Sequence, residues 1–135
     1  MKIHYRMMIE MTPVGQSFLL KSSKGEQING PSREKVAELC ELLNKSDIFS
    51  LFFTENGEMS VGIKSSLRGM FNQLIVKNGF QKPLSKSNFS KEILIIDNIK
   101  VNITLLEISF EDKIIKINPC ANLEDLIKQL HKVKL

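Results

Sequence analysis

The sequence predicts an α+β domain built mainly on antiparallel sheet, with the element order β-β-α-β-β-α-β-β-β-α and the helices packed on the sheet. Three observations predict this class. Alternating apolar and polar residues indicate strands with one buried face, apolar residues at helical spacing indicate three helices, and short turn sequences join neighbouring strands into hairpins. The 135 residues suit a single domain, 1–135, and 42% hydrophobic residues suffice for a core without metal or disulfides.

The first two strands are expected over residues 2–11 and 17–21, joined by a turn over 12–15. Alternation puts the apolar side chains of the first strand on one face, which is predicted to be buried. That face consists of Ile3, Tyr5, Met7, Ile9 and Met11. Residues 22–30 are polar and are expected to form a loop.

Pro31 is expected to occupy the first position of a helix that ends near Asn44, since proline is favoured there. The predicted buried face of this helix recurs at positions i, i+3, i+4 and i+7, namely Val36, Leu39, Cys40 and Leu43.

A second hairpin is expected over residues 48–63, with Asn56-Gly57 at the centre of a two-residue turn. A short helix over 47–53 is the alternative. Ser65 or Ser66 is expected to cap a second helix, and Asn78-Gly79 is expected to end it.

The last third of the chain predicts strands over 93–96, 99–110 and 113–118, followed by a helix with Asn122 as its N-cap. Five apolar residues lie out of phase with their neighbours: Leu94, Ile96, Leu106, Ile108 and Ile114. This phase shift predicts a bulge or a strand covered on both faces. The cover would be helices or a second subunit, so a homodimer through strands in 93–118 is one expectation.

The sequence contains no motif for a catalytic site, a cofactor or a metal ion. Phosphate-binding and dinucleotide-binding glycine loops, the serine nucleophile elbow and paired metal ligands are all missing. The residues that could bind soft metals are scattered along the chain: His4, Cys40, Cys120 and His131. We therefore expect no cofactor, no metal and no enzymatic activity. A reactive thiol at Cys120 is the enzymatic alternative, because Cys40 lies on an apolar helix face where thiols are inert.

The apolar runs predict neither a membrane segment nor a secretory signal. None approaches the roughly 18–20 residues of a membrane span, and the first residues mix charge with apolar side chains. We expect a cytoplasmic protein with free thiols and no membrane partner.

One stretch of charge is unusually uneven. The chain has a net charge of +4, yet no acidic residue lies between Glu58 and Glu92. The basic residues of this segment, 59–91, are Lys64, Arg68, Lys77, Lys82, Lys86 and Lys91. They carry all the excess positive charge and predict a surface for an anionic partner. The alternative is a solvated lysine-rich face, with its phenylalanines in the core.

The leading hypothesis is a non-enzymatic protein that binds a macromolecular partner through the basic 59–91 segment. An adaptor, an inhibitor, an immunity-type protein or a chaperone-like protein would have these features, and a protein partner is the first expectation. The alternative is a protein that binds nucleic acid or a phosphorylated ligand such as a nucleotide, with Phe80 and Phe89 stacking on bases.

Overall fold

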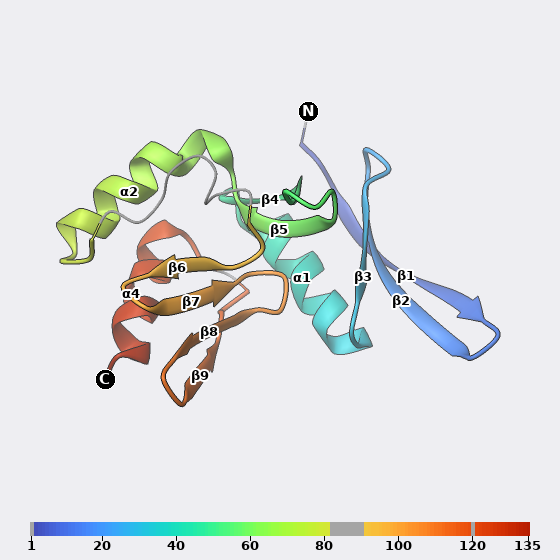
Figure 1. The fold of residues 1–135 in the computed structure, drawn as a ribbon. Coiled ribbons are helices and arrows are strands. Elements are labelled where there is room, and N and C mark those ends of the chain that lie inside the picture. The colour runs from blue at the N-terminus through green and yellow to red at the C-terminus, as the bar shows by residue number, and fades with distance from the viewer. Residues whose placement is uncertain (1, 82–90, 120) are drawn as a thin grey trace.

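The computed structural model of the chain describes residues 2–81, 91–119 and 121–135. Within these ranges it contains three antiparallel sheets and three α-helices (Figure 1). The predicted α+β class is confirmed, as is the predicted order of helices among hairpins. Two further strands appear, because one predicted loop contains a strand and one predicted strand is divided in two.

The first sheet has the order β1-β2-β3, formed by β1 (Tyr5–Thr12), β2 (Gly15–Ser22) and β3 (Gln27–Gly30). The expectation of a polar loop over 22–30 is wrong for its second half, which is β3. Ile28 is buried opposite Leu20, while the polar neighbours of Ile28 point outward. A single apolar residue is too short a pattern to indicate a strand, so only pairing with β2 makes this segment extended.

Helix α1 (Arg33–Lys45) begins two residues later than the predicted first position, Pro31. Its N-cap is Ser32, whose hydroxyl accepts a hydrogen bond from the Lys35 amide at 3.2 Å. The predicted apolar face is buried, and Leu42 is buried beside it. A side chain at Gly30 would put its Cβ 2.1 Å from Val36 Cγ2, so this glycine lets the helix approach β3 closely.

The second sheet is the hairpin of β4 (Phe49–Phe53) and β5 (Met59–Ile63), which confirms the strand interpretation over the short-helix alternative. Its turn is not the predicted two-residue type. The Thr54 amide donates to the Glu58 carbonyl at 2.7 Å, and the Gly57 amide donates to the Thr54 carbonyl at 2.9 Å. Only Gly57 has a positive φ, of 79°, so three residues form the loop and the glycine closes it.

Helix α2 (Arg68–Lys77) follows a short 3₁₀ turn, η1 (Ser65–Leu67). Neither serine caps it, since α2 has no side-chain hydrogen bond at its N-cap, Leu67. Its predicted end is confirmed: Gly79 has φ 89°, and the Phe80 amide donates back to the Ile75 carbonyl at 3.0 Å. This arrangement is a Schellman motif, which buries the residue that follows the glycine.

The third sheet has the order β6-β7-β8-β9, formed by β6 (Leu94–Ile96), β7 (Ile99–Asn102), β8 (Glu107–Phe110) and β9 (Lys113–Lys116). The predicted strand over 99–110 is two strands joined by a turn. Leu106 has φ 59° in this turn and is fully buried. Its amide donates to the Ile103 carbonyl at 3.0 Å, which closes the turn. The phase shift therefore reflects a reversal of the chain rather than a bulge or a doubly covered strand.

This reversal removes most of the reason for expecting a dimer through 93–118. Four of the five out-of-phase residues, Leu94, Ile96, Leu106 and Ile108, are at most 4% exposed and belong to the chain's own core. Only Ile114 on β9 remains exposed, at 66%. Because the monomer buries the four others, no second subunit is needed to cover them.

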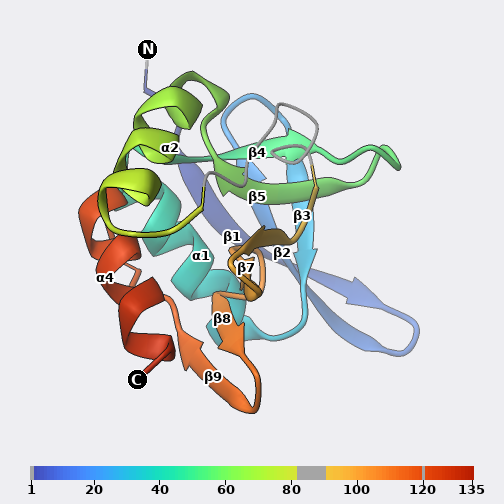
Figure 2. The ribbon, with the colours of Figure 1, turned by 60° about the vertical axis from the view of Figure 1, so that its left-hand side comes forward.

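Helix α1 lies between the first and third sheets, and α4 (Leu123–Val133) packs beside β8 and β9 (Figures 1 and 2). Asn122 is the N-cap of α4, as predicted, and its Oδ1 accepts from the Asp125 amide at 2.8 Å. One hydrophobic core joins all three helices and all three sheets. In the described part of the chain, no helix is both long and apolar enough to cross a membrane.

Candidate functional site

The described basic residues of the 59–91 segment are spread over both ends of α2 and the neighbouring segments rather than gathered in one cluster. Lys64 lies just before η1, Arg68 begins α2 and Lys77 ends it, while Lys91 lies shortly before β6. At a rise of 1.5 Å per residue, Arg68 and Lys77 are roughly 13 Å apart along the helix axis. Lys82 and Lys86 lie outside the described residues. The structure therefore brings Lys64 and Arg68 to one end of α2 and leaves Lys77 at the other.

These basic side chains are not neutralised by carboxylates of the described residues. The two ion pairs found there are Glu41–Lys45 and Glu38–Lys116, and both involve α1. The first turn of α2 carries no acidic residue, yet it begins with Arg68. A cation at a helix N-terminus is opposed by the helix dipole, so Arg68 occupies its position at some cost in stability.

The outward face of α2 adds exposed apolar side chains to this charge. Met70 is 56% exposed and Val76 is 53% exposed, and the polar side chain of Gln73 is also exposed. The buried face, with Phe71 and Ile75, packs toward the core. The α2 surface, which we define as Lys64, Arg68, Met70, Gln73, Val76 and Lys77, thus combines cations with exposed apolar groups.

The prediction that Phe80 stacks on bases is wrong. Phe80 is 6% exposed, and its ring centroid lies 4.7 Å from that of His131 on α4. The ammonium of Lys134 lies 5.4 Å from the Phe80 ring centroid. Burial follows from the Schellman motif, which turns the chain inward after Gly79. Phe89 lies outside the described residues, so its predicted role stays a prediction.

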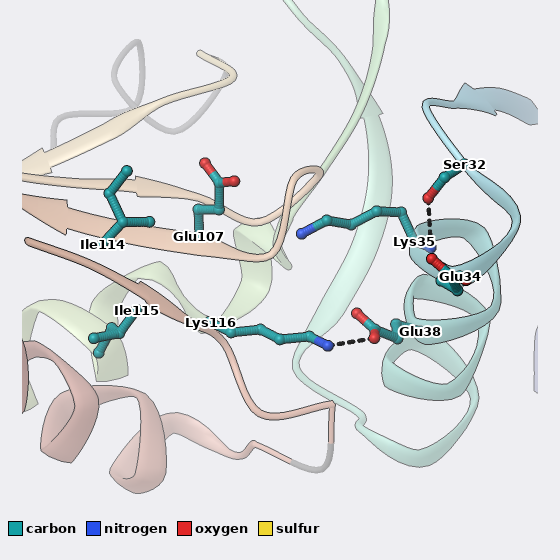
Figure 3. A pocket seen from close by; sticks show the side chains of 8 residues that line it. All are labelled: Ser32, Glu34, Lys35, Glu38, Glu107, Ile114, Ile115 and Lys116. Atoms are coloured by element: carbon teal, nitrogen blue, oxygen red, sulfur yellow. Dashed lines mark hydrogen bonds and ion pairs between the residues drawn. The ribbon is translucent and has the colours of Figure 1, made fainter.

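A cleft of about 360 Å³ opens between the start of α1 and the strands β8 and β9 (Figure 3). Its polar side chains are linked to the surrounding framework. The Lys35 ammonium donates to the Leu105 carbonyl at 2.6 Å, and Lys116 of β9 forms an ion pair with Glu38 of α1 (Figure 3). These two contacts tie α1 to the third sheet. The cleft is lined by Ser32, Glu34, Lys35, Glu38, Glu107, Ile114, Ile115 and Lys116.

The charged groups in this cleft are the carboxylates of Glu34, Glu38 and Glu107 and the ammonium groups of Lys35 and Lys116. Glu107 lies opposite Lys116 on the neighbouring strand, and Oε2 of Glu38 is buried without a hydrogen-bond partner among the described residues. None of the described residues that line it is a histidine or a cysteine. Neither this cleft nor its ion pair was predicted, because Glu38 and Lys116 are 78 residues apart in the chain. Only the packing of α1 on the third sheet brings them together.

A second cleft, of about 430 Å³, lies where β1 meets the turn between β2 and β3. Its basic side chains are His4, Arg6 and Lys21. Arg6 lies directly opposite Lys21 on the paired strand. Like charges at such positions destabilise a sheet. The sequence pattern could have indicated this pair, since both residues occupy the polar face of the predicted hairpin.

Cys40 lies on the buried face of α1, as the helical spacing predicted. Burial raises the pKa of Cys40 from 9.0 to about 11, so this thiol stays protonated at neutral pH. Cys120 lies outside the described residues. The part of the chain that the structure describes has no group of three His, Cys, Asp or Glu side chains arranged to hold a metal ion.

Comparisons with protein-family models, with curated proteins and with solved structures found no match to this chain.

Proposed function

We propose that the protein acts without catalysis, as an adaptor, inhibitor or chaperone-like protein, by binding an acidic protein partner through the α2 surface. The observation that carries the proposal is the pair of cations at the start of α2. Lys64 and Arg68 have no carboxylate partner among the described residues, and Arg68 opposes the helix dipole. A carboxylate of a partner would pair with these two cations and would offset the unfavourable interaction of Arg68 with the helix dipole.

The exposed apolar side chains favour a protein over a nucleic acid. Met70 and Val76 are exposed on the same helix that carries Arg68 and Lys77, and methionine and arginine are enriched where proteins meet. Nucleic-acid surfaces combine cations with accessible aromatic rings, whereas Phe80 is buried. The nucleic-acid alternative is therefore retained as an outcome of the test rather than as the proposal.

A charge-reversed variant tests the surface. The variant carries Lys64→Glu, Arg68→Glu and Lys77→Glu, and the control carries Lys24→Glu, Lys100→Glu and Lys113→Glu. The control changes the net charge by the same amount at exposed positions away from α2. Proteins captured on the tagged chain from its own cells are identified by mass spectrometry, and the affinity of the recovered partner is then measured by calorimetry. We expect binding to be lost in the α2 variant and retained in the control.

Two results would contradict the proposal. The first is equal loss of affinity in both variants, which would indicate net charge rather than the α2 surface. The second is binding of labelled single-stranded DNA or RNA by the unmodified chain at low salt, with affinity that falls steeply as salt is added. Steep salt dependence is the signature of phosphate contacts and would favour the nucleic-acid alternative.

A further inference from the structure

We propose that the chain forms a symmetric homodimer by antiparallel pairing of β1 with β1 of a second copy, with the two-fold axis at Met8. The proposal uses the free edge of the first sheet, so it is independent of the α2 surface. It follows from three observations on β1: which backbone groups point outward, which apolar side chains are uncovered, and how its two charges are spaced.

The edge of β1 presents backbone groups that pair with nothing among the described residues. The His4 carbonyl accepts from the Ser23 amide at 2.8 Å, so His4 faces β2. Tyr5 faces the other way, because its amide and carbonyl bond the side chain of Asn44. Backbone direction alternates along a strand, and hence Met7, Ile9 and Met11 point their amides and carbonyls away from β2.

The same three residues continue an apolar face that the monomer only partly covers. Tyr5 is buried and Met7 is half-buried, but Ile9 is 48% exposed and Met11 is 73% exposed. The hairpin of β1 and β2 extends past α1 and past the end of β3, with its tip directed away from the helices (Figures 1 and 2). The predicted burial of this face thus fails at Ile9 and Met11 in a single chain. An added strand would place an apolar neighbour beside Ile9.

The charges on the other face of β1 select the register. Arg6 and Glu10 lie two residues before and two residues after Met8, on the same side of the strand. With Met8 on the two-fold axis, Arg6 of each copy lies opposite Glu10 of the other. Met7 then pairs with Ile9 of the second copy, and these residues are the ones whose backbone groups point outward. Registers centred on Met7 or Ile9 place Arg6 opposite an uncharged residue instead.

This register also neutralises the like-charge pair in the first sheet. Within one chain Arg6 lies opposite Lys21, and Glu10 lies opposite Ser17. In the dimer the carboxylate of Glu10 from one copy approaches Arg6 of the other on the side away from Lys21, so Arg6 in each copy gains an anionic neighbour. Asn44 occupies the edge at Tyr5 and ends the new ladder there. Four backbone hydrogen bonds, from Met7 and Ile9 of both copies, are then expected, which predicts a modest dimer that forms as concentration rises.

The register is tested by exchanging the charges of Arg6 and Glu10 and measuring the mass of the full chain by sedimentation equilibrium. We expect the mass to rise with concentration from 15.4 kDa toward twice that value. Arg6→Glu alone and Glu10→Arg alone should each weaken the dimer about tenfold, because two symmetry-related pairs become repulsive. The double variant, R6E with E10R, should restore it. Both substituted positions are exposed, and circular dichroism checks that each of the three variants folds.

A cysteine on the axis provides a second measurement. Met8→Cys should form a disulfide between copies under mild oxidation, since opposed residues at that position lie about 4.5 Å apart between Cα atoms. The wild-type chain, which contains Cys40 and Cys120, is the background control. Ile114→Cys reports on a dimer through β9. A monomer at every concentration, a dimer insensitive to both charge variants, or cross-linking only at residue 114 would each overturn the proposal.

Discussion

The side-chain amide of Asn44, near the end of α1, bonds both backbone groups of Tyr5 on β1. Its Nδ2 donates to the Tyr5 carbonyl at 2.8 Å, and its Oδ1 accepts from the Tyr5 amide at 2.9 Å. The two residues are 39 positions apart. This contact fastens the first helix to the first sheet and marks the point beyond which the edge of β1 is open.

We predict that Asn44→Ala lowers the free energy of unfolding by about 2 kcal/mol, because it leaves a part-buried amide and a part-buried carbonyl without partners. Urea denaturation measures the change. Asn78→Ala is the matched control: Asn78 bonds the Leu74 carbonyl from an exposed position, and its loss should cost far less. Equal effects of the two substitutions would show that the Tyr5 contact has no special role.

At Leu106, glycine should destabilise the fold less than alanine does, which reverses the usual order of the two residues. Leu106→Ala should cost about 2–5 kcal/mol, because a fully buried side chain is lost. Leu106→Gly should be more stable than Leu106→Ala by about 1 kcal/mol, because the backbone has φ 59° and glycine adopts positive φ freely. Thermal denaturation of both variants gives the comparison.

The control for this order is Leu42, which is equally buried but lies within α1. There Leu42→Gly should be less stable than Leu42→Ala by about 1 kcal/mol, as in any helix interior. The same order at both positions would contradict a strained turn at Leu106.

The buried thiol of Cys40 should make stability fall at alkaline pH. Burial raises its pKa from 9.0 to about 11, so the folded chain keeps a proton that the unfolded chain releases above pH 9.0. Stability from this group is complete below pH 9.0 and is lost as the pH rises toward 11, by about 1.4 kcal/mol per pH unit. Burial and the nearby Glu26 carboxylate raise the pKa of Tyr5, which adds a loss of the same sign above its usual pKa of 10.0.

Urea denaturation across this pH range should show a shallower decline in the Cys40→Ala variant than in the wild-type chain. Ala cannot titrate, so only the contributions of Tyr5 and other groups remain. An identical slope in the two proteins would mean that Cys40 ionises equally in the folded and unfolded states.

Local patterns predicted most elements because each pattern reports a property of neighbouring residues. The apolar stripe of α1, the cap at Asn122 and the stop at Gly79 all depend on residues within one or two helical turns. One local turn signal was misleading. Asn56-Gly57 suggested a two-residue turn, but Gly57 alone takes the positive φ, and the two residues at Asp97-Asn98 form such a turn instead, with φ 48° and 68°.

The candidate sites likewise include one that the sequence indicates and others that form only when distant residues pack together. The acid-free segment with Lys64 and Arg68 was evident from the sequence, since charge needs no fold to be counted. The cleft of Figure 3 was not, because Glu38 and Lys116 meet only when α1 packs on the third sheet. The burial of Phe80 likewise depends on α4, which supplies His131.

The sequence by itself determined the α+β class, the hairpins, the helices and the uneven charge of residues 59–91, because periodicity, turn chemistry and charge are carried by adjacent residues. Tertiary structure alone decided where the apolar face of β1 stops being covered and which backbone groups stay open at its edge. Coverage depends on the length of α1 relative to the hairpin, and that relation exists only after residues distant in the chain have packed together. The apolar face of β1 that alternation predicted to be buried is therefore only partly covered beyond Tyr5, and we propose that a second copy covers part of the rest.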